Sequence, residues 1–93
     1  MSYIVAIHDI SDPERFWGAA DPSREFPPRI ALHASYPREG GTRAVCLWEA
    51  DSVETVRNLI ESTTGDASRN EFFEADPQHA GARGLSTHGA VTP

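Results

Sequence analysis

Residues 29–60, RIALHASYPREGGTRAVCLWEADSVETVRNLI, contain the hairpin and the helix from which the fold can be worked out. Two strand-like runs, 29–36 and 43–50, flank the turn PREGGT, whose adjacent glycines suit a two-residue hairpin loop with positive φ. Asp51-Ser52 then predicts a helix N-cap, and Glu54 falls in the first helical turn. The stretch therefore predicts two antiparallel strands followed by a helix.

The predicted helix carries one apolar stripe. Val53, Val56, Leu59 and Ile60 are spaced by three and four residues or adjacent, as on one face of an α-helix. Gly65 is the expected C-terminal cap.

Two more strands and a short helix are predicted outside this stretch. Tyr3–Ile10 reads as a strand, and Asp12 caps a helix that has Pro13 at its first position and is broken at Asp21-Pro22. Arg69–Ala75 reads as the fourth strand. The order β-α-β-β-α-β predicts an α+β fold, with a ferredoxin-like four-stranded antiparallel sheet. The predicted domain is 1–76, and the tail 77–93 is expected to lie on a partner subunit.

Strand alternation predicts which side chains share a face of the sheet. A loop centred on Gly40-Gly41 places His33 opposite Trp48 and Ser35 opposite Cys46. The more aliphatic face is expected to meet the helices. Its members are Val5, Ile7, Ile30, Leu32, Val45 and Leu47. The other face is then expected to be free of helices. Its members are Ile4, Ala6, His8, His33, Ser35, Cys46 and Trp48.

An apolar face left open should be covered by another molecule. We expect it to pack against the same face of a second copy, giving a homodimer with a small-molecule pocket between the two sheets.

Composition excludes several classes of protein. The net charge is -6 and no basic stripe is present, so nucleic-acid binding is not expected. Nothing approaches the ~20 apolar residues of a membrane span, and the N-terminus lacks the features of a signal peptide. The single cysteine fits a reducing compartment. We expect a cytoplasmic protein that binds neither nucleic acid nor membrane.

The chain resembles the dimeric α+β barrel superfamily, which includes antibiotic-biosynthesis monooxygenases, muconolactone isomerases and small nickel-binding proteins. The element order over residues 3–76 and the strand-to-helix junction CLWEADSVE, residues 46–54, carry the resemblance. The early break at Asp21-Pro22 and the long tail depart from that pattern. The resemblance implies a homodimeric small-molecule-binding protein, acting as a cofactor-free isomerase, cyclase or monooxygenase.

His8 and His33 are the candidate catalytic residues, because imidazole can accept and donate a proton near neutral pH. In this hypothesis His8 transfers the proton, His33 assists and Trp48 forms a pocket wall. The remaining candidate ligand-binding residues are Cys46, Ser35, Ile4 and Ala6. The structural interpretation of His8 is a histidine hydrogen-bonded at the edge of the core.

Two other hypotheses stay open. The set His8, His33 and Cys46 supplies nitrogen and sulfur ligands for nickel or zinc in a protein without catalysis. A structural or interaction module whose interior is filled is the third. His79 and His88 are expected to be solvated. No cofactor is predicted, since no phosphate loop, nucleophile elbow or paired-cysteine signature is present.

Overall fold

The computed structural model describes residues 1–20 and 25–81. Over these residues it contains four strands, two α-helices and one short 3-10 turn. In chain order the elements are β1 (Ser2–Ile10), α1 (Pro13–Ala19), β2 (Ala31–Pro37), β3 (Arg43–Ala50), α2 (Val53–Thr64), the 3-10 turn Gly65–Ala67 and β4 (Ser68–Glu74). The strands form one antiparallel sheet in the order β2-β3-β1-β4. This mixed α and β architecture is compatible with the predicted ferredoxin-like order.

The helices begin and end where local chemistry predicts. Asp12 caps α1 by accepting a hydrogen bond from the backbone N–H of Arg15. Ser52 caps α2 through Thr55, and Gly65, with a φ of 59°, is its C-cap. The predicted α1 break at Asp21-Pro22 lies outside the described residues, but α1 ends just before it, at Ala19.

The β2–β3 hairpin confirms the predicted turn but corrects the register. Gly40 and Gly41 both have positive φ, and Ser35 lies opposite Cys46 as predicted. A bulge between Leu32 and Ala34 then shifts the pairing by one residue, so that Leu32, not His33, lies opposite Trp48. One extra residue reverses the face of the side chain at the bulge.

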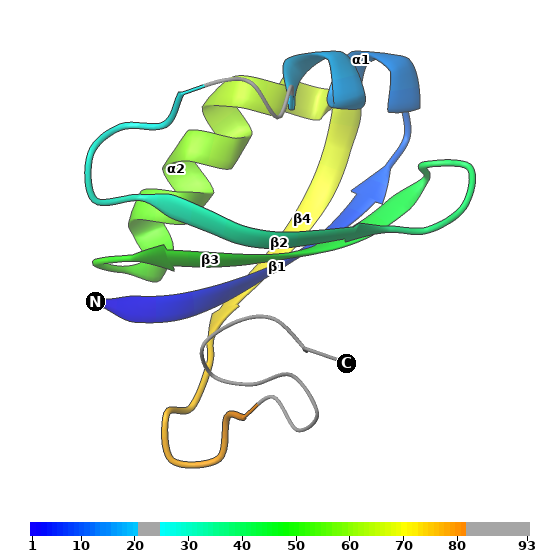
Figure 1. Cartoon of the computed structure of the whole chain (residues 1–93). Helices are drawn as coiled ribbons and strands as arrows, with labels where there is room; N and C mark the ends of the chain where they lie inside the picture. The colour runs from blue at the N-terminus through cyan, green and yellow to red at the C-terminus, as the bar shows by residue number, and fades with distance from the viewer. Residues whose placement is uncertain (21–24, 82–93) are drawn as a thin grey trace.

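Both helices cover the same face of the sheet, and it is not the face that aliphatic content predicted (Figure 1). The buried side chains of β1 and β3 all belong to the covered face. They are Ile4, Ala6, His8, Ile10, Ala44, Cys46, Trp48 and Ala50. The prediction was wrong because the helices contribute large apolar side chains to the core, including Phe16 and Val56. Small alanines on the sheet allow those side chains to approach.

The helix-free face carries four of the aliphatic side chains that were expected to meet the helices, Val5, Ile7, Val45 and Leu47. Leu32 and Ile30 do pack on the helix side, as expected. Val45 is 39% exposed and Phe73 is 46% exposed, and the two tyrosines of this face, Tyr3 and Tyr36, are at least half exposed. Strand pairing sets Val5 beside both Leu47 and Phe73. A contiguous apolar surface therefore spans the four strands.

Candidate functional site

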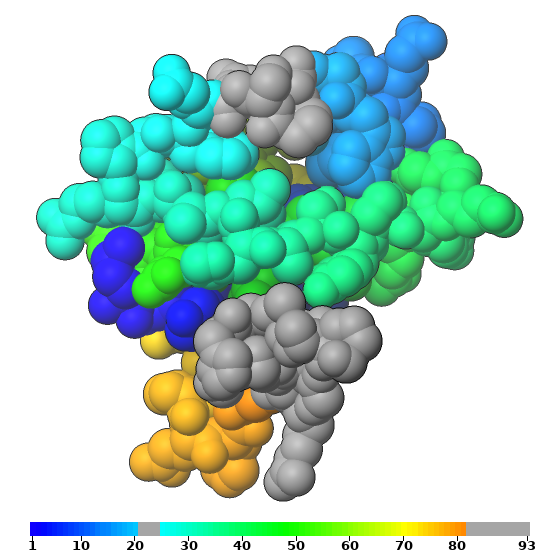
Figure 2. Space-filling model, viewed as in Figure 1, coloured from blue at the N-terminus to red at the C-terminus, as the bar shows by residue number. Residues whose placement is uncertain are grey.

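A cavity of about 440 Å³ lies between the sheet and the helices. It is of the size typical of small-molecule sites. From the side of β2, a hollow is visible between segment 25–30 and α1 (Figure 2). The lining residues come from both layers: His8, Phe16, Trp17, Ala19, Ala20, Phe26, Leu32, Ser35, Pro37, Cys46, Trp48, Leu59, Ile60, Thr63 and Thr64. None of these side chains carries a permanent charge.

His8, on β1, is the titratable base of the cavity wall. Its side chain is 1% exposed and its ring lies 5.2 Å from that of Phe16. Its Nδ1 lies 2.6 Å from the Asn70 side-chain oxygen, which also accepts a hydrogen bond from the Ser68 hydroxyl. Because a carbonyl oxygen only accepts, we infer that Nδ1 holds the proton and that Nε2 carries the free lone pair.

Burial decides the charge of His8. Removing the imidazole from water lowers its pKa below the ordinary value, and the hydrogen bond to Asn70 opposes this shift without cancelling it. His8 is therefore neutral at neutral pH. Among the described residues, the hydrogen bond of the His8 side chain is the one at Nδ1, and Nε2 makes none.

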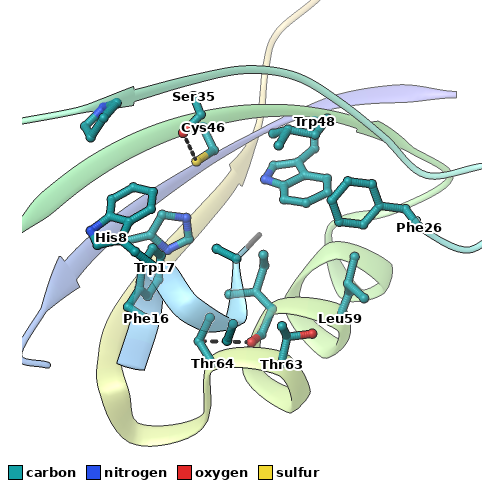
Figure 3. A pocket seen from close by; sticks show the side chains of 15 residues that line it. His8, Phe16, Trp17, Phe26, Ser35, Cys46, Trp48, Leu59, Thr63 and Thr64 are labelled. Carbon is teal, nitrogen blue, oxygen red and sulfur yellow. Dashed lines mark hydrogen bonds between the residues drawn. The ribbon is translucent and has the colours of Figure 1, made fainter. Parts of the chain in front are cut away.

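Trp48, on β3, forms the opposite end of the cavity. Its side chain is 3% exposed, and Phe26 packs edge-on against the indole with ring centroids 5.2 Å apart. Among the side chains that the structure describes, the indole Nε1 of Trp48 is the buried nitrogen or oxygen that lacks a hydrogen-bond partner. Figure 3 shows the nitrogen-bearing edge of this ring turned toward the middle of the cavity and His8 at the other end.

Cys46 and Ser35 lie side by side on β3 and β2, between these two ends (Figure 3). The thiol of Cys46 lies 3.5 Å from the Ser35 hydroxyl. Burial raises the pKa of the Cys46 thiol, and the contact with Ser35 opposes that rise only in part. Cys46 is therefore a protonated, weakly polar wall residue and not a thiolate nucleophile.

Trp17 lines the α1 side of the cavity, and a hydrogen bond to a residue outside the cavity holds its ring in place. Its indole N–H donates to the carbonyl of Gly41 at 2.9 Å, which ties α1 to the β2–β3 turn. Its ring contacts Phe16 edge-on, with centroids 4.8 Å apart. The position of this wall thus depends on the hairpin turn.

The structure separates the two candidate catalytic histidines. The bulge turns His33 to the helix-free face, where its Nε2 lies 2.8 Å from a Glu49 carboxylate oxygen and its ring lies 5.7 Å from that of Tyr3. His33 therefore lies across the sheet from His8, and the predicted shared face is wrong. Ile4 and Ala6 share the face of His8 but are buried in the core and are not among the cavity-lining residues.

The same separation removes the predicted three-residue metal set. Cys46 and His8 are on the helix side, while His33 is on the other. In residues 1–20 and 25–81, no three His, Cys, Asp or Glu side chains gather in a way that could hold a metal ion. His79 is exposed and paired with Asp76, and His88 lies outside the described residues.

Sequence reasoning did not assign Asn70, Phe16 or Phe26 to the site. Asn70 lies directly opposite His8 in the β1–β4 pairing. The alternation Ser68, Asn70, Phe72 could have indicated a polar side chain facing inward. Phe26 gave no signal, because it lies in a connection without periodicity.

Comparisons with protein-family models, with curated proteins and with solved structures found no significant match. Among the described residues, no helix is both long enough and apolar enough to cross a membrane. The fold and the site define a small α+β protein with a cavity between its sheet and its helices, and the described residues that line this cavity carry no permanent charge.

Proposed function

We propose that this protein binds an uncharged small molecule between the sheet and the helices, and that His8 accepts a proton from it. The observation that carries the proposal is a neutral histidine on the wall of an apolar cavity, whose Nε2 makes no hydrogen bond to the described residues. Apolar walls with a few placed polar groups are typical of small-molecule sites. The absence of charged side chains among the described lining residues favours a neutral ligand, because burying an unpaired ion is costly.

The chemistry that suits this site is removal of a proton next to a carbonyl group. The C–H bond breaks, its proton binds Nε2 of His8, and the electron pair moves to the carbonyl oxygen of the resulting enolate. Asn70 stabilises the imidazolium through Nδ1, because its side-chain oxygen accepts that hydrogen bond in both protonation states. Return of a proton to carbon completes an isomerisation or an exchange.

The test is deuterium exchange of 2-tetralone, a neutral two-ring ketone with an acidic C–H, in D2O. We expect the protein to accelerate exchange with saturation, and His8→Phe to reduce the catalysed rate by roughly 10²-fold or more, the usual contribution of a general base. His33→Phe is the matched control, since His33 lies on the other face. Ligand binding to both variants is measured in parallel, to separate loss of the base from loss of the cavity.

Unchanged exchange in His8→Phe, with binding retained, would exclude His8 as the proton acceptor. An equal loss of exchange in His33→Phe would contradict the assignment of the reaction to the cavity, because His33 lies on the other face of the sheet.

We further propose that the helix-free face pairs with the same face of a second copy, as in a dimeric α+β barrel. Tyr36 lies opposite Val45, and Val45 lies opposite Ile7, so a row of partly or largely exposed apolar side chains crosses these strands. A patch of this kind on a small domain marks an interaction site. Twofold symmetry lets a single apolar surface cover itself.

Sedimentation at several concentrations tests the dimer. Val45→Glu, in the middle of the patch, should yield monomers, whereas Ser62→Glu, on the exposed side of α2, should not. A wild-type chain that is monomeric throughout would refute the pairing.

A further inference from the structure

We infer that the indole N–H of Trp48 is the donor that anchors the ligand, by binding a carbonyl oxygen of it. The inference rests on the proposed cavity function and adds the ligand class: a planar neutral molecule with a hydrogen-bond acceptor at one end and a hydroxyl or other acidic hydrogen at the other.

The indole N–H of Trp48 is a buried donor that the described protein groups leave unsatisfied. Trp48 is almost fully buried, and within the described part of the chain its Nε1 has no acceptor. Buried N–H groups without a partner are rare and destabilising, and each calls for an explanation. Trp17 provides the contrast, because its indole N–H donates to the Gly41 carbonyl. The nitrogen edge of Trp48 faces the cavity, so a bound ligand is the available source of an acceptor (Figure 3).

The two ends of the cavity are complementary in their hydrogen-bonding groups. Within the part of the chain that the structure describes, Trp48 offers a donor without an acceptor. His8 offers at Nε2 an acceptor for which the same residues supply no donor. Trp48 lies opposite Ile4, four residues from His8 along β1. The Cα atoms of Trp48 and His8 are thus roughly 14 Å apart, given ~3.3 Å per residue along a strand and ~4.8 Å between strands. Both side chains extend into the intervening cavity, which leaves space for a molecule of one or two rings.

The walls between these ends set the rest of the ligand class. Phe16 and Phe26 present aromatic surface from the helix side, and Leu32 presents aliphatic surface from the sheet. Flat apolar rings suit such walls. A charged group would be left without a partner among the described lining residues, so carboxylates and amines are disfavoured.

Two matched probe pairs, one for each end of the cavity, test the inference. For Trp48 the pair is 2-acetylnaphthalene and 2-isopropenylnaphthalene, which replaces the carbonyl oxygen with a carbon of similar shape. For His8 the pair is 6-hydroxy-2-acetylnaphthalene and its 6-methyl analogue. We expect the hydrogen-bonding member of each pair to bind roughly 3- to 10-fold more tightly. Trp48→Phe should abolish the first preference, and His8→Phe the second.

NMR of the indole N–H groups gives a second readout, which is measured on the wild-type protein. The chain has two tryptophans, so two indole resonances are expected, and Trp17→Phe assigns them. The carbonyl probe should move the Trp48 resonance downfield, and the isopropenyl probe should not. The hydrogen-bonded Trp17 resonance reports any general change of the cavity.

Equal affinity for the acetyl and isopropenyl probes, or a Trp48 resonance that stays in place while the acetyl probe binds, would overturn this inference and leave the cavity function standing. No binding of any probe would overturn both.

Discussion

Substitution of Gly41 by alanine should disturb the cavity from outside it. Gly41 has a φ of 74°, and a Cβ added there would lie 2.8 Å from Nε1 of Trp17. Real Cβ atoms essentially never approach so closely, so Trp17 must move and its hydrogen bond to the Gly41 carbonyl is lost. Gly40→Ala is the matched control, because Gly40 lies in the same turn with a φ of 91° and nothing within 4 Å of its Cβ.

The magnitude follows from two contributions. Positive φ costs an alanine about 1–2 kcal/mol at either position. Gly41→Ala also loses a hydrogen bond worth about 0.5–1.5 kcal/mol. We therefore expect Gly41→Ala to be the less stable variant by about 1 kcal/mol, which lowers Tm by about 4–8 °C in a domain of this size.

Denaturant unfolding of both variants at the same protein concentration measures the difference. Binding of 2-acetylnaphthalene and the Trp17 indole resonance report the wall itself. Only Gly41→Ala should weaken binding of the probe and shift the Trp17 resonance. Equal stability losses in the two variants, with the Trp17 resonance unmoved in both, would refute the coupling between the turn and α1.

Two further predictions concern helix capping and pH. Ser52→Ala should destabilise the protein by about 1 kcal/mol in thermal unfolding, because the Ser52 hydroxyl caps α2. Ser62→Ala, on the exposed surface of the same helix, is the control and should change stability little. Because the folded state lowers the pKa of His8, the unfolded chain binds its proton first as pH falls below about 6.5, so stability should decrease from there downward. This decrease should be smaller in His8→Gln than in the wild-type protein. An identical pH profile in the two proteins would contradict the assignment.

Local chemistry was enough to determine the elements. Asp12, Ser52 and Gly65 cap the helices as their residue types predict, and Gly40-Gly41 forms the expected turn. These features depend on a few neighbouring residues whose hydrogen bonds and φ angles are set within one turn of the chain. The parity of β1 and β3 also predicted correctly that His8, Cys46 and Trp48 share a face.

Only the tertiary structure decided which face the helices cover and where His33 points. Both faces of the sheet are apolar, so side-chain content could not choose between them; packing of Phe16 and Val56 against small alanines did. A single bulged residue at His33 then reversed its face, and no local pattern in β2 signals that insertion. The sequence thus determined the strands, helices and caps, which depend on neighbouring residues. The cavity and the partner of His8 arise from contacts between distant elements, which only the folded chain brings together.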